Sequence, residues 1–111
     1  MDLKIVEIII PDSVKEIQRG AFDQSNISEI VIPNGIETIA HSLFSISKLK
    51  KITIPKSVKK IENFAFSHCS ELDTVCYEGS MNDWNKVIKE EYWNNESHRF
   101  VVKCSDGEKF E

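Results

Sequence analysis

A 22-residue repeat is the feature that most constrains how this 111-residue chain can fold. Its three prolines, Pro11, Pro33 and Pro55, are spaced at that interval. The same spacing recurs in three apolar sets: Phe22, Phe44 and Phe66; Ile17, Ile39 and Ile61; Val14, Ile36 and Val58. Because a unit this short cannot bury its own apolar side chains, successive units must stack and share one core. The period therefore predicts a solenoid.

Each unit is typical of a short strand followed by a return segment. Residues such as Ile30, Val31 and Ile32 alternate before the proline and are β-branched, which suits a strand. Proline cannot donate to a neighbouring strand and so ends the ladder. The apolar residues that follow are three or four positions apart, which predicts a short helical or irregular return path. We expect the repeated phenylalanines to stack as a column, so truncation of Phe44 should cost about 3–5 kcal/mol.

The repeated phrase L/I-x-x-I-x-I-P-x-x-V-x-x-I-x-x-x-A-F resembles the BspA-type branch of the leucine-rich repeat family. The segments that carry the likeness are Ser13-Val14, Ala21-Phe22, Ser57-Val58, Ala65-Phe66 and Cys69-Ser70-Glu71-Leu72. The likeness covers residues 5–77 as repeats, and residues 77–85 and 102–107 look like the ending common in that family. The expected fold class is an α/β solenoid, a leucine-rich repeat with short parallel strands, irregular or short-helical return segments, and a helix-plus-strand C-terminal cap.

We expect a single domain with two parts. Residues 1–77 should form the repeats, as a partial first unit followed by about three more, and residues 78–111 should form the C-terminal cap. The period is lost after Tyr77, as expected for an atypical terminal unit.

The expected cap carries its own helix and strand signals. Ser80 and Asp83 have the spacing of a capping box, which predicts a helix start. The residues expected on its packed face are Trp84, Val87, Ile88 and Tyr92. Residues 100–104 alternate and predict the last strand, before a turn at residues 105–107. The alternative, an aromatic ligand box at Trp84, Tyr92 and Trp93, is less favoured than ordinary core packing.

The N-terminal end shows no comparable cap signal. Ile5, Ile8 and Ile10 already belong to a repeat strand, with four residues ahead of them. A solenoid that starts in this way exposes its first strand edge. We therefore expect either the C-terminal piece of a longer repeat protein or self-association through that edge.

Charge and hydropathy exclude several classes of partner. A net charge of −4 disfavours binding to nucleic acid. No apolar run approaches the ~18 residues that cross a bilayer, so membrane insertion is not expected. No signal peptide is visible at the start of the chain.

We find no credible active site or metal site in the sequence. Cys69, Cys76 and Cys104 have neither CxxC spacing nor the density of a disulfide scaffold. His68 is adjacent to Cys69, but neighbouring residues usually point apart, so a nucleophile–base pair is disfavoured. Four glycines leave no phosphate-binding loop. We expect no cofactor, no metal and no enzymatic activity.

Strand alternation predicts which residues face out on the concave sheet. If residues 8, 10, 30, 32, 52 and 54 point inward, three outward rows follow. The rows are Ile9, Val31, Thr53 and Cys76; Glu7, Glu29, Lys51 and Thr74; and Val6, Ser28, Lys50 and Asp73. We single out Val31, Lys50, Lys51 and Thr53 as partner-contacting residues. The alternative is that β-branched residues face out only because they favour strands.

Charge is also unevenly distributed along the chain. Residues 48–70 hold six lysines and one glutamate, whereas the segments on either side are acidic. This lysine band predicts recognition of an acidic partner, unless it is an ordinary solvated surface.

These observations favour a non-enzymatic protein-interaction or adhesion module that binds through its concave sheet. The resemblance implies a cell-surface or extracellular microbial protein, often used in attachment. The alternative is a structural capping and assembly segment of a longer repeat protein, with no ligand of its own.

Overall fold

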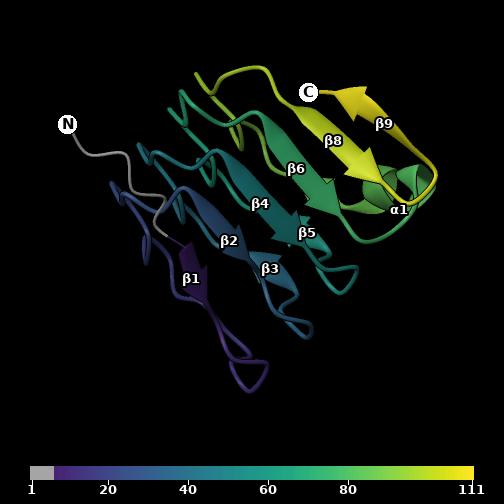
Figure 1. Ribbon diagram of the computed structural model, residues 1–111, viewed down its shortest axis with the longest axis horizontal. Helices are drawn as coiled ribbons and strands as arrows, with labels where there is room; N and C mark the ends of the chain where they lie inside the picture. Colours follow the sequence, from purple (N-terminus) through teal and green to yellow (C-terminus); the bar gives the residue numbers. More distant parts are fainter. Residues whose placement is uncertain (1–6) are drawn as a thin grey trace.

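The computed structural model describes residues 7–111, which form a β-solenoid of about four turns with little helix (Figure 1). One wall is a six-stranded sheet, called here the front sheet, with strand order β1-β2-β4-β6-β8-β9. Its strands are β1 (Glu7–Ile9), β2 (Glu29–Val31), β4 (Lys51–Ile54), β6 (Thr74–Tyr77), β8 (Val101–Cys104) and β9 (Gly107–Phe110). All pairs are parallel except β8 with β9, so a hairpin closes the C-terminal edge of this sheet.

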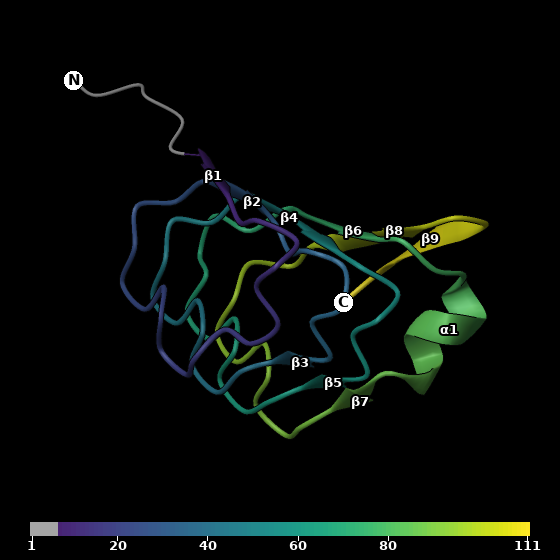
Figure 2. The ribbon, with the colours of Figure 1, turned by 90° about the horizontal axis from the view of Figure 1, so that it is seen from below.

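A second ladder, the back sheet, lies on the opposite side of the solenoid (Figure 2). It consists of β3 (Thr38–Ile39), β5 (Lys60–Ile61) and β7 (Ile88–Lys89), paired in parallel in that order. The helix α1 (Met81–Lys86) lies between β6 and β7, where earlier turns have a plain loop. Return paths were expected to be helical or irregular, and the helical form is wrong for the first three turns, whose return paths contain turns and, in the second and third, short strands.

The third wall, called here the side wall, is built of turns that include residues 20–24 and their equivalents. Their backbone N–H groups donate to the next turn, as from Gly20 to the His41 carbonyl at 3.0 Å and from Phe22 to the Leu43 carbonyl at 3.0 Å. Two corners of this wall are left-handed in each turn. The φ angles of one corner are 56° at Gln24, 54° at Ile46, 57° at His68 and 59° at Glu96. The recurring corner shows that residues near 96 complete a fourth equivalent turn.

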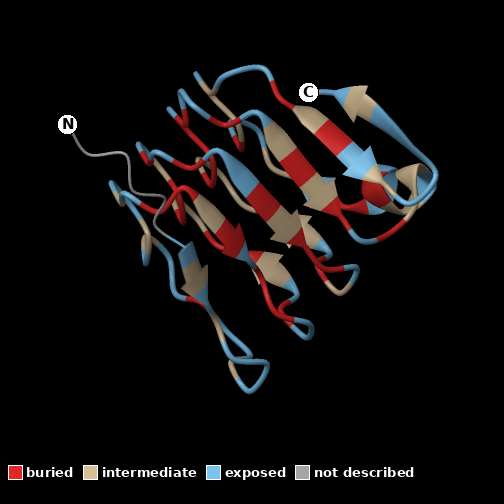
Figure 3. Cartoon of the chain, in the orientation of Figure 1, coloured by how far each residue is buried: buried red, intermediate tan, exposed pale blue. Residues whose placement is uncertain are grey.

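The core lies between the three walls, and the predicted phenylalanine column is confirmed. The Phe22 and Phe44 rings stack at 5.5 Å, and Phe44 and Phe66 stack at 5.6 Å, with interplanar angles of 9° and 6°. The inward isoleucines are also confirmed, since residues 30, 32, 52 and 54 are buried and Ile8 and Ile10 pack against the same core. Figure 3 shows that burial is dense in the middle turns and sparse in the first turn.

The helix is shorter than the apolar spacing suggested. Ser80 accepts from the Asp83 N–H at 3.0 Å and donates its own N–H to the Asp83 carboxylate at 3.1 Å, which forms the capping box. The helix ends at Lys86, however, because the following residues pair with β5 as β7. Ile88 is consequently 62% exposed and Tyr92 is 52% exposed, so neither lies on a packed helix face. The strand over Val101–Cys104 is followed by β9 and is not the last.

Candidate functional site

The outer face of the front sheet carries most of the residues predicted to contact a partner. The register pairs Ile9 with Val31, Val31 with Thr53 and Thr53 with Cys76, which makes one continuous outward row. Ile9 is 85% exposed and Val31 is 54% exposed. Apolar side chains therefore face solvent at the N-terminal half of this row.

The neighbouring row is charged and changes sign along the sheet. Glu7 pairs with Glu29, Glu29 with Lys51, and Lys51 with Thr74. Lys50 is exposed just before β4, where its N–H donates to the Ser28 carbonyl at 2.8 Å. The ion pairs found among residues 7–111 do not involve Lys50 or Lys51. Both ammonium groups are thus available to an acidic partner.

The third predicted row is not a continuous exposed row. Ser28 is 7% exposed, because it precedes β2 where the chain turns into the core, and Val6 lies outside the described residues. Lys50 and Asp73, by contrast, are exposed as predicted.

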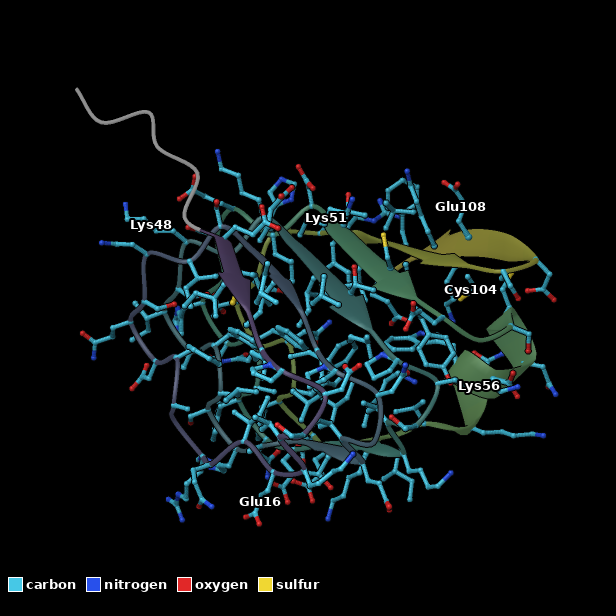
Figure 4. The ribbon with its side chains drawn as sticks, turned by 60° about the horizontal axis from the view of Figure 1, so that its bottom comes forward. Glu16, Lys48, Lys51, Lys56, Cys104 and Glu108 are labelled. Atoms are coloured by element: carbon cyan, nitrogen blue, oxygen red, sulfur yellow. The ribbon has the colours of Figure 1, made fainter. Side chains whose placement is uncertain are left out.

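The six lysines of residues 48–70 encircle the third turn and do not gather on one face. Figure 4 shows Lys48 and Lys51 toward the front sheet and Lys56 beside α1. Lys56 lies 3.5 Å from the Asp83 carboxylate, and Lys60 lies 3.2 Å from that of Glu90. Part of the band is therefore engaged within the molecule, which leaves a smaller basic patch at Lys50 and Lys51.

Cys69 and Cys104 pack in or against the core, whereas Cys76 belongs to the outward row. Cys69 is fully buried, and its Sγ donates to the Phe44 carbonyl at 3.1 Å. Burial raises the pKa of the Cys69 thiol, which disfavours the thiolate that a nucleophile requires. His68 is exposed, so the adjacent pair does not converge on one site. Burial likewise raises the pKa of Cys104.

The three aromatic residues considered as a ligand box do not form one. Trp84 and Trp93 are buried and meet edge to face at 6.1 Å, within the core. Tyr92 lies outside and stacks on Phe64 at 5.8 Å. Lys89 covers Trp84, with Nζ 4.2 Å from the ring centroid and 2.7 Å from the Trp84 carbonyl oxygen. Burial lowers the pKa of Lys89, and its bonds to backbone carbonyls indicate a structural role.

Two carboxylates join successive turns, an arrangement that the sequence did not reveal. Glu62 accepts the His41 N–H at 3.1 Å, and Glu90 accepts the Asn63 N–H at 3.0 Å. The Asn63 N–H, followed by Lys60, holds the pKa of Glu90 below its ordinary value. The position one repeat before Glu62 is Ala40, which offers no acceptor. The sequence shows that Ala40 and Glu62 are one repeat apart. It does not show which backbone N–H groups lie near a carboxylate at this position, because that depends on how the turns stack.

The described residues contain no group of three or more His, Cys, Asp or Glu side chains arranged to hold a metal ion. Among the same residues, no helix has the length and apolar character needed to span a membrane.

Comparison with known proteins adds a family match. A family model described as "BspA type Leucine rich repeat region (6 copies)" matches residues 1–101. No curated protein and no solved structure matches the chain.

Proposed function

Because this chain belongs to the BspA-type leucine-rich repeat family, we propose that it is a non-enzymatic module that binds another protein through the outer face of its front sheet. Leucine-rich repeats generally mediate protein interactions, which supports the class of function. The observation that carries the choice of face is an exposed apolar row beside two lysines that form no ion pair with residues 7–111. An exposed apolar strip bordered by charge is typical of a protein-binding surface.

The proposed contact residues are Val31, Lys50, Lys51 and Thr53. Val31 would supply apolar area, and the two lysines would meet carboxylates of the partner. Such charge complementarity acts mainly on association rate and specificity. A partner with an apolar patch next to acidic residues fits this surface best.

The proposed setting is adhesion at a microbial cell surface or in the extracellular space. The support is the family, whose members are typically surface-associated.

The alternative function is structural, as a capping and assembly segment. It is favoured by the difference between the two edges of the front sheet. β9 closes one edge as a hairpin, while the outer edge of β1 has no pairing strand among residues 7–111. In this proposal residues 78–111 act as the cap, and β1 stacks on a further repeat or on a second copy.

The two functions are separated by a charge-reversal experiment. We expect Lys50→Glu with Lys51→Glu to weaken binding to a responsive extracellular matrix or cell-surface protein by at least tenfold, because both ammonium groups face the partner. The matched control is Lys59→Glu with Lys86→Glu, which makes the same charge change at exposed residues away from the front sheet. Surface plasmon resonance measures the affinity, and circular dichroism checks the fold of each variant. Equal weakening of binding by the two double variants would contradict the front sheet as the binding face. If the unaltered protein binds none of the extracellular matrix and cell-surface proteins tested, the structural alternative is favoured.

A further inference from the structure

The back wall of the solenoid is joined differently at its first junction than at the later two. Between the second and third turns, the Glu62 N–H donates to the Ile39 carbonyl at 2.9 Å. Between the third and fourth turns, the Glu90 N–H donates to the Ile61 carbonyl at 3.0 Å. The corresponding donor at the first junction is the Ala40 N–H, and it forms no bond to the Ile17 carbonyl among the described residues.

A second bond of the same ladder is also missing there. The Lys60 N–H donates to the Glu37 carbonyl at 3.3 Å, and the Ile88 N–H donates to the Lys59 carbonyl at 2.9 Å. One repeat earlier, the Thr38 N–H and the Lys15 carbonyl are not bonded, and residues 15–17 are not part of the back sheet. The first turn is therefore attached along the front sheet and the side wall but not along the back wall.

The junctions also differ in the side chain at the position of residue 40. At the later junctions, Glu62 and Glu90 accept backbone N–H groups of the preceding turn. Ala40 cannot accept the equivalent Arg19 N–H, which has no acceptor in the described part of the chain. Arg19 is exposed, so an acceptor from outside the chain can reach this backbone donor.

An open groove of about 620 Å³ lies along this unjoined wall. One bank is formed by residues 15–19 and the other by residues 35–38 and Ala40, and Glu62 of the third turn also lines the groove. Ile17 and Ile36 are buried and contribute apolar surface to the groove. Among residues 7–111, the carbonyls of Lys15 and Ile17 on one bank and the N–H groups of Thr38 and Ala40 on the other have no hydrogen-bond partner. An extended main chain has donors and acceptors on both of its edges, and thus complements both banks at once.

We propose that this groove binds an extended peptide segment of a partner protein, which enters the back sheet as an added parallel strand between residues 15–19 and β3. The surroundings also define the side chains of that peptide. Its inward residue is aliphatic, since it faces Ile17 and Ile36. The next residue is acidic, because its carboxylate accepts the Arg19 N–H in the way that Glu62 accepts the His41 N–H. This site is independent of the front face and of the lysines proposed there.

The protein's own sequence supplies a probe with this chemistry. Residues 58–63 already lie beside β3 on its other edge and carry the aliphatic–acidic pair at Ile61 and Glu62. A fluorescent peptide with the sequence of residues 58–63 is expected to bind the full chain saturably in fluorescence polarisation. The control peptide is N-methylated at the amides of the second lysine and the glutamate, which removes both donors to the Lys15 and Ile17 carbonyls. Binding of the methylated peptide is expected to be at least tenfold weaker.

A protein variant tests the opposite bank. Thr38→Pro removes the N–H that faces the groove, and proline is tolerated at a strand edge where that group has no partner. We expect it to weaken peptide binding at least tenfold, whereas Thr38→Val and the Lys50→Glu, Lys51→Glu pair leave binding unchanged. Thermal melts followed by circular dichroism verify the folded state; if Thr38→Pro does not fold, the methylated peptide on the unaltered protein decides the question.

Three results would overturn the proposal. The first is no binding of the unmodified peptide up to millimolar concentration. The second is equal binding of the methylated and unmodified peptides. The third is concentration-dependent protection of the Thr38 and Ala40 amides without peptide, which would assign the groove to a second copy of the chain.

Discussion

The first and last junctions between turns use the same stacking but differ in how completely they close. At both junctions the front strands pair in parallel and side-wall N–H groups donate to the next turn. Only the later junctions add the back ladder and a glutamate that bonds the preceding backbone. The repeat period is thus enough for stacking of the front and side walls, whereas the back ladder is present only at the junctions that carry this glutamate.

Burial follows the same division. Ile17 retains 9% exposure, whereas its equivalents Ile39 and Ile61 are fully buried. Phe22 is half-buried, whereas Phe44 and Phe66 are fully buried within the same ring column. The first turn should therefore be the least stable part of the solenoid, since local stability follows buried apolar contact.

The largest expected difference is in the ring column. Phe44→Ala should lower the free energy of unfolding by about 3–5 kcal/mol, because it leaves a cavity between two stacked rings. Phe22→Ala should lower it by only about 1–2 kcal/mol, because less apolar area is lost. Urea unfolding followed by circular dichroism measures both. Equal losses for the two variants would show that the first turn is packed as tightly as the second.

A smaller change in the free energy of unfolding, of opposite sign, is expected when a carboxylate is introduced at Ala40. Ala40→Glu supplies an acceptor for the Arg19 N–H and should raise the free energy of unfolding by about 0.5–1.5 kcal/mol, the net value of one hydrogen bond. It should also close the groove and abolish binding of the peptide probe. Ala40→Gln is the matched control, because its amide oxygen can accept the same bond without adding charge. If Ala40→Glu lowers the free energy of unfolding while Ala40→Gln raises it, the negative charge of the glutamate outweighs the hydrogen bond at this junction, and the expectation for Ala40→Glu is wrong.

Strand alternation and the repeat spacing were enough to predict the parallel strands of the front sheet, but not β9. They place equivalent residues in register, so the inward isoleucines, the outward row through Val31 and Thr53, and the phenylalanine column follow directly. They could not predict the back sheet, because strands of two residues carry no periodic signal. They also misplaced Ile88, since pairing of β7 with β5 overrides the local helical spacing.

The candidate surfaces were predictable to different degrees. Lys51 faces out because of its strand position, which the sequence shows. Lys56 lies in a loop and Lys60 in the two-residue strand β5, and their pairing with Asp83 and Glu90 depends on how distant turns stack. The groove beside β3 lies where Ala40 lacks the carboxylate of Glu62, and its hydrogen-bonding groups belong to the backbone, which every sequence contains. Nothing in a linear pattern marks such a site.

Amide hydrogen exchange followed by NMR tests the open first junction most directly. The comparison is between the equivalent donors Thr38 and Ala40 at the first junction, Lys60 and Glu62 at the second, and Ile88 and Glu90 at the third. We predict that the Thr38 and Ala40 amides exchange at least ~10-fold faster than the other four, because an amide without an acceptor has no bond to break before it exchanges. Equal protection of all six amides would contradict it, since it would mean that the first turn closes onto β3 like the others.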